Sequence, residues 1–291
     1  MKYKEIQAKT LLNKLKYPDS WFGVQYTINI YKGCNFQCIY CDSRSECYRI
    51  DDFNDIEIKI NADEILYSEL RKKRNKNTIA IGAMSDSYNC ADQKYKLTSK
   101  CLNIIAEAGF PLHLRTKSNR IVEDINILKK VETNGLSTAF SVSTTDDTLA
   151  KIIEPGASVP SERFKAMKTL SDAGLYTGII MMPILPFIED TMENIKEIVQ
   201  KTKENGGQFI VPWLGVTLRD RQKIFYFNKL DEHFPGMRKK YENYYKNTYD
   251  CRCVNEKELY KYFSALCEGL KIQYKPSEIN KFDQAEQLSL F

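Results

Sequence analysis

The sequence predicts an α/β fold, a partial (βα)6 barrel of the TIM type with a C-terminal helical cap. Three observations support this prediction: apolar, β-rich runs alternate with amphipathic helical segments, several runs are apolar almost throughout, and glycines follow the helical segments. Near-continuous apolar runs are typical of parallel strands covered on both faces, and strand–helix alternation gives right-handed crossovers. Because six units are fewer than the eight of a closed barrel, we expect an open barrel. The expected strands are 24–31, 78–83, 112–116, 137–143, 176–182 and 208–214.

The helical segments between these strands have recognisable ends. Asn61 with Glu64 is spaced like a capping box that opens the first of them. Asp190 with Glu193 has the same spacing before the helix expected over 191–204. A left-handed residue is favoured just after a helix, and glycine adopts that conformation most readily. The glycines in this position are Gly109, Gly135, Gly174 and Gly206.

The chain divides by composition into four parts. We expect an N-terminal extension over 1–20 and the barrel over 21–215. After Gly215 basic and aromatic residues become more frequent, and we expect a helical cap over 216–275 that packs on the barrel. Residues 276–291 are mostly polar, so we expect a flexible tail there.

The composition limits the kinds of chemistry. With 43% hydrophobic and 28% charged residues, the chain resembles a soluble globular protein, and no apolar run is long enough to cross a membrane. The 43 basic and 38 acidic residues leave a charge of +5, which permits a nucleic-acid partner without requiring one. There are nine cysteines, two histidines and no apolar leader at the N-terminus. We therefore expect reduced thiols in the cytoplasm, and chemistry based on sulfur rather than imidazole.

The most informative segment is the loop after the first expected strand. It contains Cys34, Cys38 and Cys41 in the spacing C-x3-C-x2-C, and Gly33 lets the backbone turn sharply before them. In such barrels ligands lie at the carboxyl ends of the strands, where this loop is expected. A structural zinc site uses four ligands in two spaced pairs, whereas a [4Fe–4S] cluster held by three thiolates keeps one iron open for catalysis. The alternative to a cluster held by three thiolates is one with Cys47 as a fourth ligand.

This cysteine spacing, with the aromatic Tyr40 directly before the last cysteine, resembles the motif of the radical S-adenosylmethionine (SAM) superfamily. Segments 21–23, 41–45, 154–157 and 182–187 are similar to its spore-photoproduct-lyase-like branch, often called DNA repair photolyases. The resemblance implies a barrel of the radical SAM type, a [4Fe–4S] cluster on the three cysteines, and SAM. It also implies that the cluster passes one electron to SAM, which breaks into methionine and a 5′-deoxyadenosyl radical that abstracts hydrogen from a substrate. An electron donor such as flavodoxin or ferredoxin is then needed.

The resemblance also assigns SAM contacts to the strand ends. It places small residues after the second strand around the SAM amino group, where Gly82 and Ala83 allow close backbone approach. Ser85 or Asp86 is then expected to accept hydrogen bonds from the ammonium group. Tyr40 is expected to contact the cofactor from the cysteine loop.

Three further strands contribute to the expected SAM site. Lys117, after the third strand, is a compact positive charge suited to the SAM carboxylate. Ser141 and Ser143 share one face of the fourth strand by the period of two, and either can bond a ribose hydroxyl or the carboxylate. Met182 ends the fifth strand, where family members pack apolar groups against adenine. Glu154 resembles part of a family Glu-Pro-Gly segment, and its role stays open.

The chain departs from this branch after the second strand. Relatives read Ser-Asp-Pro-Tyr-x-Pro-x-Glu, whereas residues 85–92 here read Ser-Asp-Ser-Tyr-Asn-Cys-Ala-Asp. The enzyme that names the branch uses a cysteine as hydrogen donor near the segment that matches 84–86, and the nearest cysteine here is Cys90. Cys90 is therefore the candidate catalytic hydrogen donor, with an incidental thiol as the alternative. These departures bear on the substrate and leave the cofactors unchanged.

Two features of the C-terminal part bear on nucleic acid. The cap mixes basic and aromatic residues, which contact phosphates and stack on unpaired bases, although ordinary amphipathic helices have the same composition. Gln287, Leu288, Leu290 and Phe291 resemble the short peptide motif that binds the bacterial sliding clamp, which implies recruitment to DNA. The alternative for these residues is a chain end that docks on its own domain.

Together these features predict a radical SAM enzyme that abstracts hydrogen from damaged DNA, as in spore-photoproduct-lyase-like repair. One alternative is a radical SAM enzyme that modifies RNA, a peptide or a small molecule. The other is a non-catalytic iron–sulfur or zinc protein. The fold alone does not choose among them, because function depends on the site.

Overall fold

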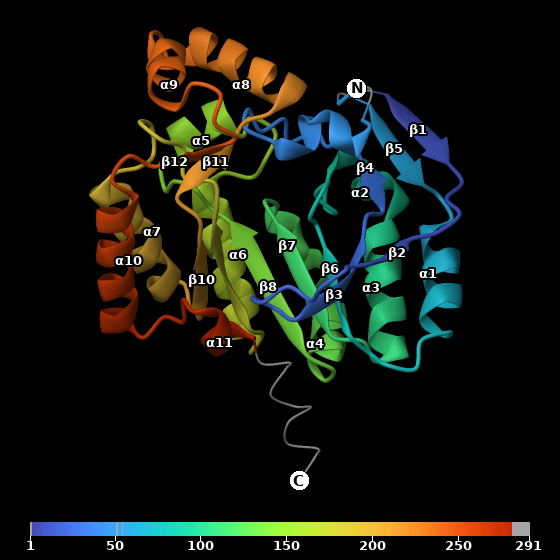
Figure 1. The fold of residues 1–291 in the computed structure, drawn as a ribbon. Helices are drawn as coiled ribbons and strands as arrows, with labels where there is room; N and C mark the ends of the chain where they lie inside the picture. The colour runs from blue at the N-terminus through green and yellow to red at the C-terminus, as the bar shows by residue number, and fades with distance from the viewer. Residues whose placement is uncertain (1, 51, 54, 281–291) are drawn as a thin grey trace.

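A seven-stranded sheet organises the molecule (Figure 1). The computed structural model describes residues 2–50, 52–53 and 55–280. Within these residues the six expected strands run parallel, and an antiparallel strand pairs at one edge, so the predicted partial barrel is confirmed. Across the sheet the strands are β10 (Phe209–Pro212), β9 (Thr177–Met181), β8 (Leu136–Ser141), β7 (Leu112–Thr116), β6 (Thr78–Ile81), β3 (Val24–Ile28) and β2 (Leu12–Lys14).

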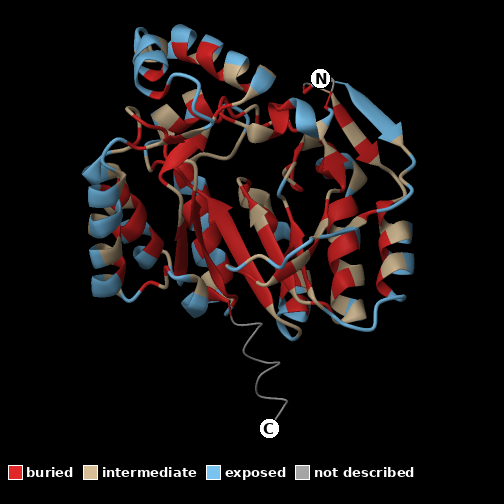
Figure 2. Cartoon of the chain, in the orientation of Figure 1, coloured by how far each residue is buried: buried red, intermediate tan, exposed pale blue. Residues whose placement is uncertain are grey.

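Helices cover the outer face of this sheet and bury the larger core (Figures 1 and 2). Each helix presents an apolar stripe to strands whose side chains are almost all buried, as near-continuous apolar runs require. None of the helices in the described ranges has the length and apolarity needed to cross a bilayer. The outer helices are α1 (Ala62–Leu70), α3 (Leu97–Ala108), α4 (Ile125–Glu132), α6 (Pro160–Asp172) and α7 (Met192–Glu204). The short α2 (Cys90–Tyr95), α5 (Asp147–Ile153) and the 3-10 helices η1 (Asp42–Arg44), η2 (Glu46–Tyr48) and η3 (Asn119–Asp124) lie in the connections.

The inner face of the sheet carries a smaller core that closes the amino end of the barrel. Phe22 stacks on His113 with ring centroids 3.7 Å apart, and Phe209 meets Phe22 edge-on at 5.6 Å. Ile279 is packed into the same cluster. Burial lowers the pKa of His113 to about 3, so the ring is neutral and serves as packing. These side chains fill the amino end of the barrel interior.

The helix ends agree with the sequence at the glycines and differ at two caps. Gly109, Gly135, Gly174 and Gly206 all have positive φ, as expected. The Asn61 side chain does not cap α1, because its amide pairs with the backbone N–H and C=O of Ala8 at 2.9 and 3.1 Å. The N-cap of α7 is Thr191 rather than Asp190, and its hydroxyl accepts from the Asn194 N–H at 3.1 Å. At Asn61, hydrogen bonds with the distant Ala8 backbone therefore replace the local capping pattern.

The segments before and after the barrel contribute to two small additional sheets. In the N-terminal extension, β1 (Tyr3–Ile6) pairs with β5 (Ile56–Lys59), which also pairs with β4 (Tyr31–Lys32). After the barrel, β11 (Gly215–Thr217) pairs with β12 (Asp250–Arg252), while α8 (Asp220–His233) and α9 (Met237–Tyr245) lie over the carboxyl ends of the strands (Figure 1).

The last described segments differ from the expected division. Helix α10 (Glu256–Leu270) packs against α7 in the outer layer rather than over the mouth of the barrel. The expected flexible tail does not begin at residue 276, because Pro276–Ile279 form α11 and Ile279 is buried in the inner core. Ile279 is apolar in an otherwise polar stretch, and burying its side chain in the inner core favours packing of this segment on the barrel.

Candidate functional site

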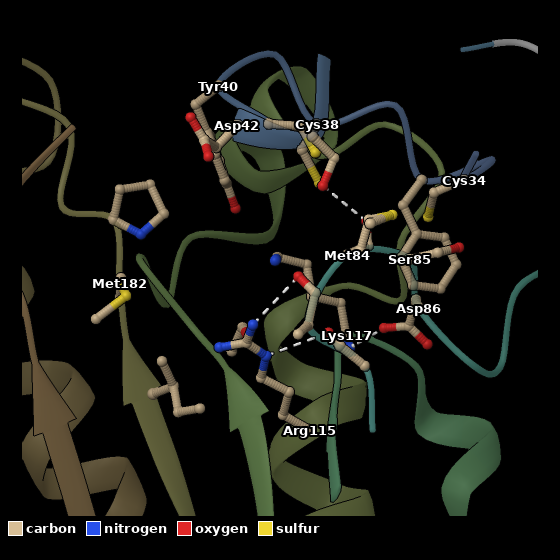
Figure 3. A pocket seen from close by; sticks show the side chains of 18 of the residues that line it. Cys34, Cys38, Tyr40, Asp42, Met84, Ser85, Asp86, Arg115, Lys117 and Met182 are labelled. Atoms are coloured by element: carbon tan, nitrogen blue, oxygen red, sulfur yellow. Dashed lines mark hydrogen bonds between the residues drawn. The ribbon is translucent and has the colours of Figure 1, made fainter. Parts of the chain in front are cut away.

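A cavity of about 430 Å³ lies at the carboxyl ends of the strands (Figure 3). The cysteine loop, residues 33–42, forms one wall, and the ends of β6, β7, β8 and β9 form another. From the cysteine loop, the predicted site residues in its lining are Cys34, Cys38, Tyr40 and Cys41. From the strand ends they are Gly82, Ala83, Ser85, Asp86, Lys117, Ser141 and Met182. Eleven of the thirteen predicted site residues therefore meet here.

Two glycines allow the backbone to take the path that shapes this cavity. Gly33 has φ of +85°, and a Cβ there would lie 2.2 Å from the Asp55 carbonyl oxygen. Gly82 has φ of +92°, and a Cβ would lie 2.0 Å from the Arg115 carbonyl oxygen. Any other residue at either position would be strained and would clash with backbone. Ser85 then joins the two walls, because its hydroxyl donates to the Gly33 carbonyl at 2.5 Å.

The cysteine loop offers three thiols at one wall of the cavity. Within the described part of the chain, no group of three Cys, His, Asp or Glu side chains lies close enough to hold a single ion. In a [4Fe–4S] cluster each thiolate binds a different iron, so three thiols spread along one cavity wall fit it. Burial raises the pKa of the Cys34 thiol to about 12, and it also raises that of Cys38, so metal binding would have to displace these protons.

A buried ionic network ties the cysteine loop to α5 and α6. The Tyr40 hydroxyl donates to Glu154, whose other oxygen pairs with Arg163. Arg163 and Glu154 are only 1% and 2% exposed. Burial opposes ionisation of Glu154, but Arg163 and then Lys117 outweigh it and hold its pKa below the ordinary value. For Lys117, Cys38 and Glu154 outweigh burial and raise the pKa, so the ammonium group is charged at the cavity wall.

Asp86 and Ser85 are already occupied by partners within the protein. Asp86 accepts from the Thr116 hydroxyl at 2.8 Å, from Lys117 N at 2.8 Å and from Tyr88 N at 3.0 Å. Its carboxylate therefore ties the end of β6 to the end of β7. We expect Asp86 to position Lys117 and leave direct contact with the SAM ammonium to backbone carbonyls.

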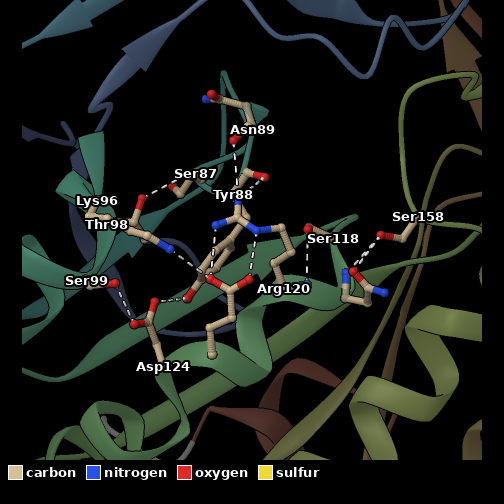
Figure 4. A network of polar contacts seen from close by, with 12 residues as sticks. Ser87, Tyr88, Asn89, Lys96, Thr98, Ser99, Ser118, Arg120, Asp124 and Ser158 are labelled. Atoms are coloured by element: carbon tan, nitrogen blue, oxygen red, sulfur yellow. Dashed lines mark hydrogen bonds and ion pairs between the residues drawn. The ribbon is translucent and has the colours of Figure 1, made fainter. Parts of the chain in front are cut away.

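Behind this wall, polar contacts hold the segment that differs from the branch pattern (Figure 4). The Tyr88 hydroxyl and the Ser99 hydroxyl donate to the two oxygens of Asp124, at 2.9 and 2.6 Å. Thr98 donates to the Ser87 carbonyl at 2.8 Å. Asp92, at the position of the missing glutamate, accepts from Tyr31 at 2.6 Å. These bonds fix the segment without the two prolines that relatives have there.

Two predicted site residues lie outside the cavity lining. Strand β8 ends at Ser141, so the alternation that would place Ser143 on the same face does not continue, and Ser143 is buried beside Glu189. Cys90 starts α2, its N–H donates to the Asn35 side chain at 2.9 Å, and it packs against the outer core. The cysteines that line the cavity, among the described residues, are those of the loop. The arrangement therefore gives Cys90 no direct route to a ligand in the cavity.

Sequence reasoning missed Arg115, which lines the cavity from β7 (Figure 3). Its guanidinium donates to the carbonyls of Gly82 and Ala83 at 3.2 and 3.1 Å. Arg115 lies within β7, two residues before the predicted site residue Lys117, and this closeness in sequence was the available signal. The two cations make this wall of the cavity suited to a carboxylate.

Helix α8 holds the cysteine loop from outside. The Arg44 guanidinium lies 4.2 Å from the Phe53 ring centroid and 3.6 Å from that of Phe225, and it also bonds Gln37. Arg221 donates to the carbonyls of Arg44 and Ile50, at 2.7 and 2.5 Å. Arg221, one of the basic residues of the expected cap, is therefore used within the protein.

An aromatic rim, formed by Tyr48, Trp213 and Tyr249, also lines the cavity. The Arg219 guanidinium lies 5.8 Å from the Tyr48 ring centroid and 5.5 Å from that of Tyr249, and it pairs with Asp42 at 2.6 Å. The Arg252 guanidinium lies 4.8 Å from the Trp213 ring centroid. The aromatic side chains thus line the cavity, whereas Arg219 and Arg252 lie outside its lining and pair with carboxylates of the protein.

A family model of the radical SAM superfamily matches residues 28–201, which is over half of the 291 residues. The chain belongs to the radical SAM superfamily. Its cofactors are therefore a [4Fe–4S] cluster and SAM, and the alternative of a non-catalytic iron–sulfur or zinc protein is set aside. The donor set at the cavity fits both groups, with three thiols on one wall and Lys117 and Arg115 on the other.

Relatives of this radical SAM enzyme occur in bacteria and archaea. An uncharacterized protein of Mycobacterium tuberculosis is 25% identical over 252 residues, 84% of this chain and 74% of that protein. An uncharacterized protein of Methanocaldococcus jannaschii is 28% identical over 202 residues, 68% of this chain and 72% of that protein.

Solved structures of spore photoproduct lyase share the fold of this radical SAM enzyme. The complex of that lyase with dinucleoside spore photoproduct has a TM-score of 0.72 at 16% identity, covering 94% of this chain and 81% of the lyase. A variant with bound AdoMet and the same dinucleoside has a TM-score of 0.70 at 16% identity, covering 93% and 80%. At this identity the likeness establishes the fold, including the parts outside the family match.

Proposed function

We propose that this radical SAM enzyme abstracts hydrogen from damaged DNA. The observation that carries the proposal is the aromatic rim of the cavity, formed by Tyr48, Trp213 and Tyr249. Aromatic side chains stack on unpaired bases, so the rim suits a nucleotide lifted out of a duplex. Likeness of fold to a lyase complexed with a dinucleoside photoproduct supports the same substrate class.

In this proposal the cavity residues divide between the two cofactors. Cys34, Cys38 and Cys41 hold the cluster, which supplies the electron that generates the hydrogen-abstracting radical from SAM. Lys117, with Arg115 beside it, binds the SAM carboxylate, and the small residues Gly82 and Ala83 let the SAM amino group approach the backbone closely. Tyr40, Ser141 and Met182 contact the nucleoside part. The buried walls exclude water from the reacting atoms.

Two partners belong to the proposal. Reduction of the cluster needs a one-electron donor such as flavodoxin or ferredoxin. The motif residues Gln287, Leu288, Leu290 and Phe291 lie outside the described residues, and the sequence supports binding of a bacterial sliding clamp through them. A pull-down with purified clamp tests this, because deletion of 287–291 should abolish retention, and unchanged retention would contradict it.

The substrate is tested by 5′-deoxyadenosine formation in the anaerobically reconstituted enzyme. We expect an ultraviolet-irradiated duplex to stimulate deoxyadenosine release, and the same duplex without damage to stimulate it less. Stimulation by RNA or by a peptide instead would transfer the proposal to that substrate class. No stimulation by any nucleic acid would contradict action on DNA and favour a small molecule.

A further inference from the structure

A second basic surface lies at the amino ends of the strands. The loop 71–77 between α1 and β6 holds five cations and no acidic residue among seven positions. Lys72, Lys73, Arg74, Asn75 and Asn77 of this loop, with Lys14 of β2, line a concave surface here called the basic groove. Every lysine and arginine in it is exposed. The groove is thus open to a ligand from solvent.

The basic groove is on the opposite side of the barrel from the cavity. The loop enters β6 at Thr78, whereas the cavity begins after β6 ends at Ile81. In Figure 1 the loop runs below α1, at the end of the barrel away from the cysteine loop, and Figure 2 shows it exposed. The amino-end face of such barrels serves stability rather than catalysis, so a charged groove there calls for a separate explanation.

The charges of the basic groove are not balanced within the protein. Lys14, Lys72, Lys73 and Arg74 form no ion pair with any described residue. Glu69, the acidic residue nearest the loop in sequence, is occupied, because one oxygen accepts from Leu11 N and Leu12 N at 3.1 and 2.7 Å. The Lys73 ammonium nitrogen lies 5.5 Å from the ring centroid of Tyr26, and this contact holds the Lys73 stem over the groove. Uncompensated like charges repel one another and destabilise the free protein.

The chemistry of the lining selects among anionic ligands. Cations and side-chain amides are the groups that contact phosphate oxygens in nucleic-acid complexes. A membrane-binding surface would need exposed apolar side chains, and a protein interface would need an apolar centre. The groove offers neither, because its remaining lining residues are Gln25 and the buried Tyr26.

We propose that the basic groove binds the phosphate backbone of a nucleic acid, as a second contact on the face opposite the active site. One straight duplex cannot reach both faces of the barrel, so the groove engages a second segment of nucleic acid. This inference is independent of the lesion that the active site takes, and it extends the proposed function from one contact to two.

The test compares the full-length holoenzyme with a variant carrying Lys72→Gln, Lys73→Gln and Arg74→Gln. Binding of an undamaged labelled duplex is measured at several salt concentrations. We expect the magnitude of the negative slope of log affinity against log salt to fall by about 3, near 0.9 for each phosphate that the variant no longer neutralises. Substitution of exposed residues in a turn should leave stability nearly unchanged, which thermal unfolding checks. A charge-matched control carries Lys165→Gln, Lys257→Gln and Lys261→Gln on α6 and α10.

Several outcomes would overturn the inference. An unchanged salt slope, or an equal decrease in the charge-matched control, would show that the groove is an ordinary solvated surface. Competition by inorganic tripolyphosphate as strong as by the duplex would make the ligand a free phosphate, and retention of anionic vesicles would make it a lipid surface. Energy transfer between two differently labelled duplexes should appear with the wild type and disappear with the variant. Deoxyadenosine formation without nucleic acid should be the same in both, so failure of this inference is distinguishable from failure of the proposed substrate.

Discussion

Tyr40 and Glu154, which are 114 residues apart in the sequence, are joined by a hydrogen bond inside the protein. Tyr40 lies between two cysteines of the loop, and Glu154 is the C-cap of α5. The bond therefore connects the cysteine loop to the end of α5, the helix that follows β8. Glu154, whose role the sequence left open, acts here as a positioning residue.

Replacing Glu154 should destabilise the protein. Glu154→Ala leaves the Arg163 guanidinium, 1% exposed, without its partner, and removing one member of a buried ion pair costs about 3–5 kcal/mol. Glu154→Gln should cost less, because it keeps the shape and one hydrogen bond. Urea unfolding measures both, with Glu162→Ala on the exposed face of α6 as control. An Ala variant as stable as that control would refute a structural role for the pair.

Arg44 should raise the reduction potential of the cluster. Its guanidinium lies between the rings of Phe53 and Phe225. Burial lowers the pKa of Arg44, and the three loop cysteines are close enough to oppose this effect. A nearby cation stabilises the more negative, reduced cluster. Arg44→Gln should therefore shift the midpoint potential to more negative values in a redox titration followed by electron paramagnetic resonance. Arg49→Gln removes the same charge from an exposed position, and an equal shift in that control would contradict the prediction.

Glu189 should make stability depend on pH. Burial raises its pKa to about 8, against an ordinary value of 4.5. Between these values the folded chain keeps a proton that the unfolded chain has lost, so the free energy of unfolding should fall as pH rises from about 5 to about 8. The full shift corresponds to a loss on the order of 5 kcal/mol. Glu189→Gln should remove this part of the pH dependence in urea titrations, and an unchanged profile would exclude Glu189 as its source.

Tyr249 should contribute to binding of nucleic acid. Stacking of one base on an aromatic ring is worth about 1–3 kcal/mol, so Tyr249→Ala should weaken binding of damaged DNA by about 5- to 150-fold. Tyr249 and Tyr260 are matched in exposure, at 45% and 44%, but Tyr260 lies on α10 away from the cavity. Fluorescence anisotropy should show weaker binding for Tyr249→Ala alone. Equal effects of the two substitutions would remove the rim from the substrate site.

The strands and the cavity wall were predictable because local sequence determines them. Apolar runs bounded by glycine located the parallel strands, and the rule that ligands lie at strand ends located Lys117 and Met182. Ser143 was placed wrongly because the period of two holds only while the strand continues, and β8 ends at Ser141.

The rest of the site depends on tertiary contacts that the sequence does not reveal. Arg44 and Phe225 are far apart in the chain, and only the packing of α8 on the cysteine loop brings them together. Trp213 and Tyr249 belong to segments on either side of α8, and the pairing of β11 with β12 brings those segments together. No local pattern marks such residues as neighbours.

The central claim is that Cys34, Cys38 and Cys41 hold the cluster on which SAM is cleaved. The decisive measurement is iron and sulfide content together with 5′-deoxyadenosine formation in the anaerobically reconstituted wild type, in each single cysteine-to-alanine variant, and in Cys47→Ala and Cys90→Ala. We expect each of the three loop variants to lose both the cluster and SAM cleavage, while Cys47→Ala and Cys90→Ala keep the cluster and cleave SAM. Cleavage of SAM at the wild-type rate by any of the three loop variants would contradict the account.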